Sequence, residues 1–113
     1  MRIKTSESYG AVIITLKGNV MGGDNTKTFN KMLHKYLDSN KKNIVVDLKG
    51  VKFMNSSGLG MLIGGLTTMK KGDGNLKLAG ASDKIESLLI ITKLITIFDT
   101  FKTVEEAIDS YKN

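Results

Sequence analysis

The stretch from residue 43 to residue 60 constrains the fold most, because a strand pattern runs directly into the start of a helix. It reads NIVVDLKGVKFMNSSGLG. The largely β-branched, apolar run from Ile44 to Leu48, interrupted by Asp47, is bounded by turn-forming residues, which is typical of a strand covered on both faces. Apolar residues then recur at helical spacing as far as Met69, and Gly72 follows. This pattern predicts a helix from about Ser56 to about Lys71.

Ser56 is the residue at which this predicted helix begins. A serine there commonly caps the helix, because its hydroxyl accepts a hydrogen bond from an otherwise unpaired backbone amide. The same position can also carry a phosphate without unfolding the domain, since the exposed amides and the helix dipole favour an anion. The residues alone leave both roles open.

The pattern D-L-x-x-V-x-F-M-N-S-S-G-L-G, which ends at Gly60, resembles the signature of the STAS-domain anti-sigma factor antagonists. The resemblance implies an α/β fold, a single STAS-like domain with a mixed β-sheet flanked by about four α-helices. It also implies that a partner kinase phosphorylates Ser56, the first serine of the motif. The other positions that match the family are Asp47, Leu48, Met54, Ser57, Gly58, Leu59 and Gly60.

Two positions depart from the family pattern, and both lack a carboxylate that the family usually has. Asn55 replaces the usual aspartate before the serine, and Met21 ends a Gly-Asn-Val-Met segment where the family commonly has an acidic residue. Both departures remove a negative charge near the predicted phosphorylation site.

The remaining elements follow from periodicity and from capping residues. A hairpin is predicted around Tyr9-Gly10, because apolar and polar residues alternate after the turn. Helices are predicted after Asp24, Ser82 and Thr103, each of which can act as an N-cap. The predicted apolar stripe of the first helix is Phe29, Met32, Leu33, Tyr36 and Leu37, and further strands are expected at 76–79 and 95–98.

Composition limits the class of protein. The chain has 113 residues, no cysteine and no obvious linker, so we expect one domain over residues 1–113. No secretory signal or membrane-spanning segment is recognisable, and a cytoplasmic location is the default expectation.

Seventeen basic and eleven acidic side chains give a net charge of +6. The lysines are dispersed and Arg2 is the only arginine, which argues against nucleic-acid binding.

No combination of residues in the sequence indicates an enzyme, a metal site or a cofactor. Gly58, Gly60 and Gly64 have the spacing G-x-G-x-x-x-G, which differs from the dinucleotide-binding fingerprint. His34 is the only histidine and lies on the polar side of the first predicted helix, so we expect it to be solvated. The serines have no histidine at a motif spacing that could activate them.

The leading hypothesis is a bacterial partner-switching regulator of transcription, acting in a stress response. The resemblance implies that it binds an anti-sigma factor, a serine kinase of the histidine-kinase-like ATPase type, and is released by phosphorylation at Ser56. A serine phosphatase is a possible further partner. The alternative is an unphosphorylated STAS docking or scaffold module that binds a signalling protein, a transporter or a small ligand, and Asn55 and Met21 favour it.

The predicted partner surface surrounds Ser56 and follows the face of the next helix opposite its apolar stripe. That face is expected to be nearly flat, with Met61 as its one flexible apolar side chain. The residues assigned to this surface are Met21, Gly22, Asp24, Asn55, Ser57, Gly58, Gly60, Met61, Gly64 and Thr68.

Overall fold

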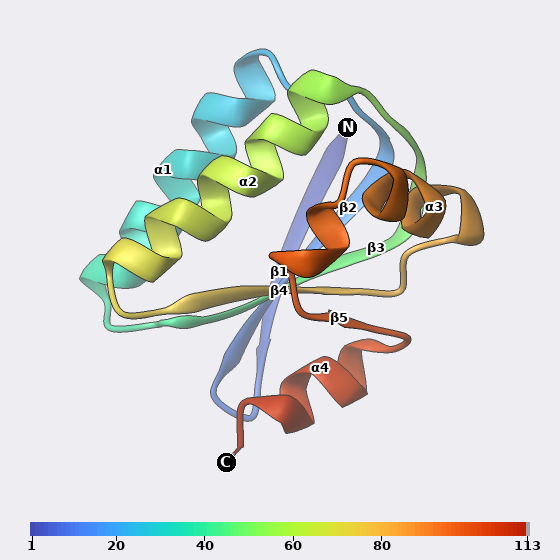
Figure 1. The fold of residues 1–113 in the computed structure, drawn as a ribbon. Helices are drawn as coiled ribbons and strands as arrows, with labels where there is room; N and C mark the ends of the chain where they lie inside the picture. The colour runs from blue at the N-terminus through green and yellow to red at the C-terminus, as the bar shows by residue number, and fades with distance from the viewer. Residues whose placement is uncertain (113) are drawn as a thin grey trace.

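A five-stranded mixed sheet with the strand order β1-β2-β3-β4-β5 forms the centre of the computed structural model, which describes residues 1–112 (Figure 1). The first pair is antiparallel, and each later pair is parallel. The predicted α/β fold, with a mixed sheet and four α-helices, is confirmed. The strands are β1 (Arg2–Ser8), β2 (Ala11–Val20), β3 (Asn43–Met54), β4 (Asn75–Ala79) and β5 (Thr100–Phe101).

The predicted hairpin joins β1 to β2 through a two-residue turn. Tyr9 and Gly10 have φ values of 48° and 79°, and Ser8 pairs with Ala11. Positive φ at both central residues matches the right-handed twist of the paired strands, as in the favoured two-residue hairpin turns. The glycine adopts this conformation without steric cost.

The helices cover the two faces of the sheet unequally. In Figure 1, α1 (Asp24–Asp38) and α2 (Ser56–Lys71) lie side by side over one face, and α4 (Val104–Ser110) lies against the other. Alternating side chains follow this division: Ile14 and Val46 belong to the larger core, whereas Ile13 and Val45 pack in a smaller core with α4. Helix α3 (Asp83–Ile91) completes the larger core through Ile85 and Leu89.

Capping explains where the helices begin. As predicted, Ser82 caps α3 and Thr103 caps α4, each accepting a hydrogen bond from the amide three residues later. The prediction that Asp24 caps the first helix was wrong, because Gly23 is the N-cap. Asp24 is instead the first helical residue, where its carboxylate interacts favourably with the positive end of the helix dipole.

The predicted stripe of α1 is confirmed, with Phe29 and Leu33 buried.

The predicted strand at 95–98 was wrong. This segment contains a 3₁₀ helix, η1 (Leu94–Thr96), and the final strand β5 comes later. Lys93 has a φ of 63°, which ends the preceding helical path, and Phe98 is buried in the larger core. The apolar run therefore reflects the packing of a connecting segment onto the core instead of pairing in the sheet.

Candidate functional site

Asn55 forms the junction between β3 and α2. Its backbone is extended, with a φ of −96° and a ψ of −178°, and its side-chain Oδ1 accepts a hydrogen bond from the Gly58 amide at 2.8 Å. Its own amide donates to the Val20 carbonyl at 3.3 Å. Of the two roles left open for Ser56, capping of α2 is therefore excluded, because Asn55 satisfies the orphan amide that a cap must satisfy.

Ser56 is the first helical residue and is exposed to solvent. Within residues 1–112, its hydroxyl makes no hydrogen bond, and the neighbouring Ser57 is also exposed. The first turn of α2 contains no acidic side chain. The Ser56 hydroxyl therefore lies beside the positive end of a helix dipole, where an added phosphate would be stabilised and would displace no existing contact.

The loop between β2 and α1 contacts the start of α2. Gly22 has a φ of 77°, and a Cβ placed on it would lie 2.8 Å from the Cβ of Ser57. On the same side, Gly58 approaches the backbone carbonyl of Val20. The fold thus brings the predicted residues Met21 and Gly22 next to the serine motif. Met21 is 45% exposed, so its thioether is accessible at this edge of the site.

The exposed face of α2 continues the surface away from the serines. Gly60 and Gly64 are exposed, and a Cβ on either residue would meet no atom within 4 Å. Thr68 is half-buried and donates a hydrogen bond from its hydroxyl to Oδ1 of Asn30 on α1 at 2.9 Å. The predicted small-residue face of α2 is therefore present and borders α1.

Met61 does not lie on that face as predicted, since it is only 2% exposed. It belongs to the larger core and helps to line a groove of about 260 Å³ between α1 and α2. Because α1 packs alongside α2, more of the circumference of α2 is buried than its main apolar stripe indicates. Only the part of Met61 that lines this groove is accessible from outside the core.

Three residues of α1 complete the groove and were missed by sequence reasoning: Thr26, Lys27 and Asn30. Their spacing of three and four residues on the polar side of the helix was the available signal. That signal could not show which other helix they would face. The last predicted residue, Asp24, is exposed at the start of the same helix.

The surroundings of the site contain no arrangement typical of a metal centre. Among residues 1–112, no three His, Asp or Glu side chains cluster as metal ligands would, and His34 is exposed as predicted. In the same part of the chain, no helix has both the length and the apolar character needed to cross a membrane.

Comparison with known proteins identifies the family. The STAS domain model matches residues 2–107, so this chain belongs to the STAS domain family. One relative is the anti-sigma-B factor antagonist of Staphylococcus aureus (strain NCTC 8325 / PS 47), which is 40% identical over 53 residues. That match covers 47% of this chain and 49% of the relative, so the chain spans about half the length of the curated relative it matches. That relative is named for antagonism of the anti-sigma-B factor.

Solved structures share the fold over almost the whole chain. A candidate anti-sigma factor antagonist from Thermotoga maritima has a TM-score of 0.87 at 21% identity, covering 98% of this chain and 95% of its own. The anti-sigma factor antagonist SpoIIAA in its unphosphorylated form has a TM-score of 0.74 at 19% identity, covering 99% of each chain. The Bacillus SpoIIAA has also been solved in its phosphorylated form, again with a TM-score of 0.74 and 19% identity, covering 98% of this chain and 100% of its own.

Proposed function

We propose that this chain is an anti-sigma factor antagonist whose binding is switched by phosphorylation of Ser56. In the unphosphorylated state it binds an anti-sigma factor, which is a serine kinase of the histidine-kinase-like ATPase type. Phosphorylation by that kinase releases it, and a serine phosphatase restores binding. The observation that carries the proposal is the exposed Ser56 hydroxyl at the start of α2. This hydroxyl is not used as the helix cap, because the Asn55 side chain accepts the hydrogen bond from the Gly58 amide instead.

Local charge and fit, more than long-range attraction, account for the switch. A phosphate adds about −1.5 to −2 charges, whereas the net charge of the chain is +6. The protein therefore remains cationic after modification. If a partner carboxylate or apolar patch must desolvate the phosphate, a loss of about 4 kcal/mol weakens binding roughly a thousandfold.

The proposed interface combines the three segments that meet at this end of the fold. Met21, Gly22 and Asp24 come from the loop after β2 and the start of α1. Asn55, Ser57 and Gly58 surround the phosphoacceptor, and Gly60, Gly64 and Thr68 extend the surface along α2. Because glycines present no side chain, a partner helix or strand can approach the backbone of α2 closely.

Phosphopeptide mapping tests the proposal directly. A pull-down with the wild-type protein supplies the cognate kinase, which is then incubated with ATP and with wild type, Ser56→Ala or Ser57→Ala. We expect phosphate on Ser56 in the wild type and in Ser57→Ala, and none in Ser56→Ala. Phosphate on Ser57 alone, or no phosphate on the wild type, would contradict the assignment.

A matched pair of variants tests the consequence for binding. Ser56→Ala is expected to stay locked to the anti-sigma factor in the presence of ATP, because it cannot be phosphorylated. Ser56→Asp mimics part of the added charge and is expected to fold but bind poorly. Equal capture of both variants would show that charge at this position does not control binding.

The second candidate function is an unphosphorylated docking or scaffold module that uses the same surface. Asn55 and Met21 favour it, because they stand where the family motif that the sequence resembles usually has a carboxylate. The intact mass of the protein after growth under stress separates the two functions, since only the switch requires an added phosphate. Under either function, we propose a single cytoplasmic domain over residues 1–113 that binds no nucleic acid.

A further inference from the structure

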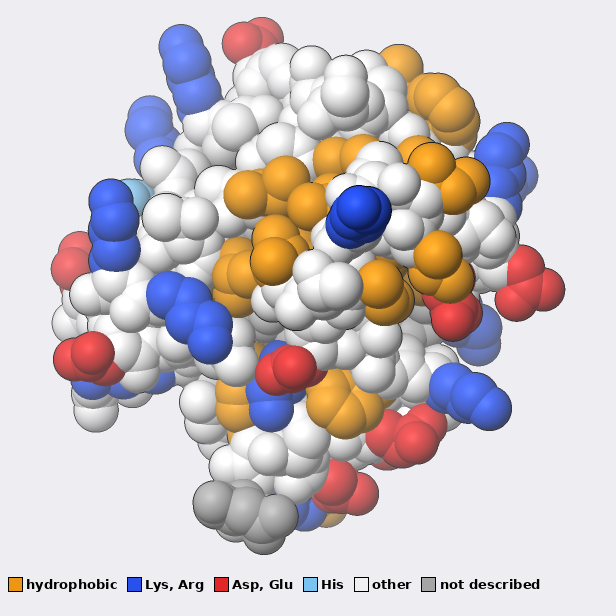
Figure 2. Space-filling view, viewed as in Figure 1, with side chains coloured by type: hydrophobic (Ala, Val, Ile, Leu, Met, Phe, Trp, Pro, Cys, Tyr) orange, Lys and Arg blue, Asp and Glu red, His pale blue; other side chains and the backbone are white. Residues whose placement is uncertain are grey.

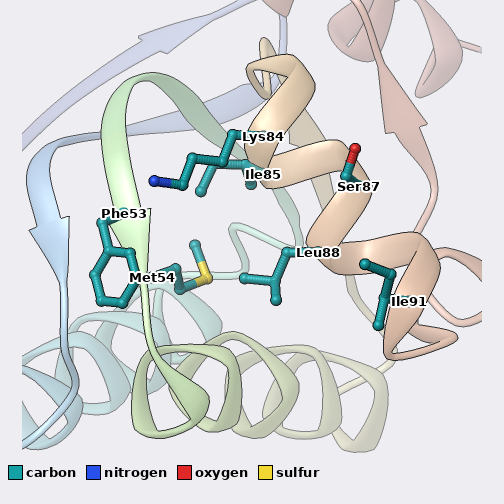
Figure 3. Close-up of a pocket in the computed structure, with 7 residues that line it drawn as sticks. All are labelled: Phe53, Met54, Lys84, Ile85, Ser87, Leu88 and Ile91. Atoms are coloured by element: carbon teal, nitrogen blue, oxygen red, sulfur yellow. The ribbon is translucent and has the colours of Figure 1, made fainter.

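A second recess lies beside the residues that lead into the Ser56 junction and shares no lining residue with the groove between α1 and α2. It has a volume of about 400 Å³ and lies between the end of β3 and α3 (Figure 3). Five of the seven residues that line it are apolar, and the other two are Lys84 and Ser87. The apolar lining residues are Phe53, Met54, Ile85, Leu88 and Ile91.

The apolar lining combines a buried floor with an exposed rim. Met54 and Ile85 are 2% and 1% exposed, whereas Ile91 is 78% and Phe53 is 41% exposed. Figure 2 shows hydrophobic side chains gathered on the face formed by α2, α3 and η1. A contiguous apolar surface that remains exposed in a folded domain marks a binding site more often than an isolated exposed residue does.

The recess has one cationic end and one apolar end. Figure 3 shows the Lys84 ammonium group pointing toward Phe53, whereas Leu88 and Ile91 lie farther along α3. The Lys84 Nζ atom lies 5.7 Å from the centre of the Phe53 ring. Within the described residues, Lys84 forms no salt bridge, so its charge is available to an incoming anion. The Ser87 hydroxyl points away from the apolar walls in the same view.

We propose that this recess binds a single-chain amphiphile with a carboxylate head, of the size of a medium-chain fatty acid. Lys84 holds the carboxylate at the cationic end, and the alkyl chain packs between Met54, Leu88 and Ile91. The recess volume of about 400 Å³ lies within the range of about 300–1,000 Å³ that small-molecule sites have. Decanoate, which has a carboxylate head and an unbranched alkyl chain, is the probe for this ligand class.

The charge and shape of the recess decide between ligand classes. A cationic amphiphile would place its head beside Lys84 and be repelled, whereas a carboxylate forms a charge-assisted hydrogen bond there. A fully polar anion would leave the apolar walls without contacts. This site does not include Ser56, so the proposal stands independently of the phosphorylation cycle.

Titration of the intact protein with decanoate below its micelle concentration tests the proposal. Calorimetry measures affinity, and the methyl NMR signals of Met54 and Leu88 report the location. We expect saturable shifts at both methyl groups, and decanoate should bind about tenfold more tightly than octanoate because two further methylenes are buried. Decyltrimethylammonium should bind at least tenfold more weakly than decanoate.

Adjacent isoleucines on α3 provide a matched pair of variants. Ile91→Ser removes a wall of the recess and should weaken decanoate binding at least fivefold. Ile90→Ser changes an isoleucine that is 54% exposed but does not line the recess, and it should leave affinity within twofold. Lys84→Ala should weaken decanoate binding about tenfold and abolish the preference over decyltrimethylammonium.

Three results would overturn the proposal. The first is unchanged Met54 and Leu88 methyl signals at millimolar decanoate. The second is equal loss of affinity in the Ile90 and Ile91 variants, which would indicate nonspecific adsorption to α3. The third is loss of anti-sigma factor capture in Ile91→Ser together with no decanoate binding to the wild type, which would make this recess a protein contact.

Discussion

The backbone carbonyl oxygen of Val20 occupies the space that a side chain on Gly58 would need. Gly58 is buried in the first turn of α2, and Val20 is the last residue of β2. The same carbonyl accepts a hydrogen bond from the Asn55 amide. This close approach fixes the serine motif against the end of β2 and sets the position of the adjoining Met21-Gly22 loop.

Gly58→Ala is therefore expected to destabilise the domain by at least about 1–3 kcal/mol, because the added methyl group must displace backbone. Gly60→Ala is the matched control, since a Cβ there meets no atom within 4 Å. That control should be neutral or more stable by about 0.5–1 kcal/mol, as alanine is the better helix former. Chemical denaturation of both variants measures the difference, and equal stabilities would contradict the close approach.

The capping residue gives a second prediction. Asn55→Ala should reduce the free energy of unfolding by about 0.5–2 kcal/mol, because it leaves the Gly58 amide without its acceptor. Ser56→Ala should change it by less than about 0.5 kcal/mol, as expected for a surface position without a specific contact. Thermal and urea denaturation measure both. A larger loss for Ser56→Ala than for Asn55→Ala would show that Ser56 is the cap after all.

The charge at position 55 is expected to affect stability and phosphorylation separately. Asn55→Asp keeps an oxygen acceptor for the Gly58 amide and adds a negative charge at the start of α2, so stability should rise by about 0.3–1 kcal/mol. The same charge lies beside the incoming γ-phosphate and should change the rate of Ser56 phosphorylation. Kinetics with the cognate kinase measure this rate, and an unchanged rate would show that Asn55 is not a recognition element.

The exposed glycine face of α2 is expected to be necessary for partner capture. Gly64→Glu should weaken binding of the anti-sigma factor by at least tenfold, about 1.4 kcal/mol, because it adds bulk and charge to a close contact. The far-UV spectrum and the cooperative melting transition should remain. His34→Glu is the control, because it adds a glutamate at another exposed helical position. Undiminished capture by Gly64→Glu would place the interface elsewhere.

Alkaline pH should weaken the attachment of α4 through Tyr111. Its hydroxyl donates a hydrogen bond to the Ile44 carbonyl at 2.7 Å, and Lys77 Nζ lies 4.0 Å from the centre of its ring. Burial, more than the nearby Asp99 charge, raises the pKa of the Tyr111 phenol well above its ordinary value. Above about pH 10 the Tyr111 phenol therefore stays protonated in the folded state but loses its proton in the unfolded state. The free energy of unfolding falls as the pH rises from about 10 toward the pKa of the folded state.

Tyr111→Phe isolates this effect. It should reduce stability by about 1 kcal/mol near neutral pH, because the Ile44 carbonyl loses its side-chain donor. It should also make the decline above about pH 10 shallower than in the wild type. Tyr9→Phe is the control at a tyrosine that is 79% exposed. Identical pH profiles for Tyr111→Phe and the wild type would exclude this role for the phenol.

Local sequence patterns were sufficient for most elements of the fold. The apolar run at 44–48 predicted a buried strand, and this part of β3 is indeed mostly buried. The capping residues Ser82 and Thr103 marked two helix starts, because each accepts a hydrogen bond from the amide three residues later. The motif around Ser56 indicated the family and the location of the candidate site. These features depend on residues that are close to one another in the sequence, so local patterns are sufficient to predict them.

Only the tertiary structure decided features that depend on contacts between distant segments. The Val20 carbonyl accepts a hydrogen bond from the Asn55 amide and leaves no room for a side chain at Gly58, and no local pattern specifies this contact between distant segments. Met61 is buried because α1 packs against α2, and the apolar run before Phe98 covers the core without joining the sheet. The sequence by itself determined most of the strands and helices, whereas packing between segments determined the path of the chain from residue 94 to residue 101 and which side chains remain exposed.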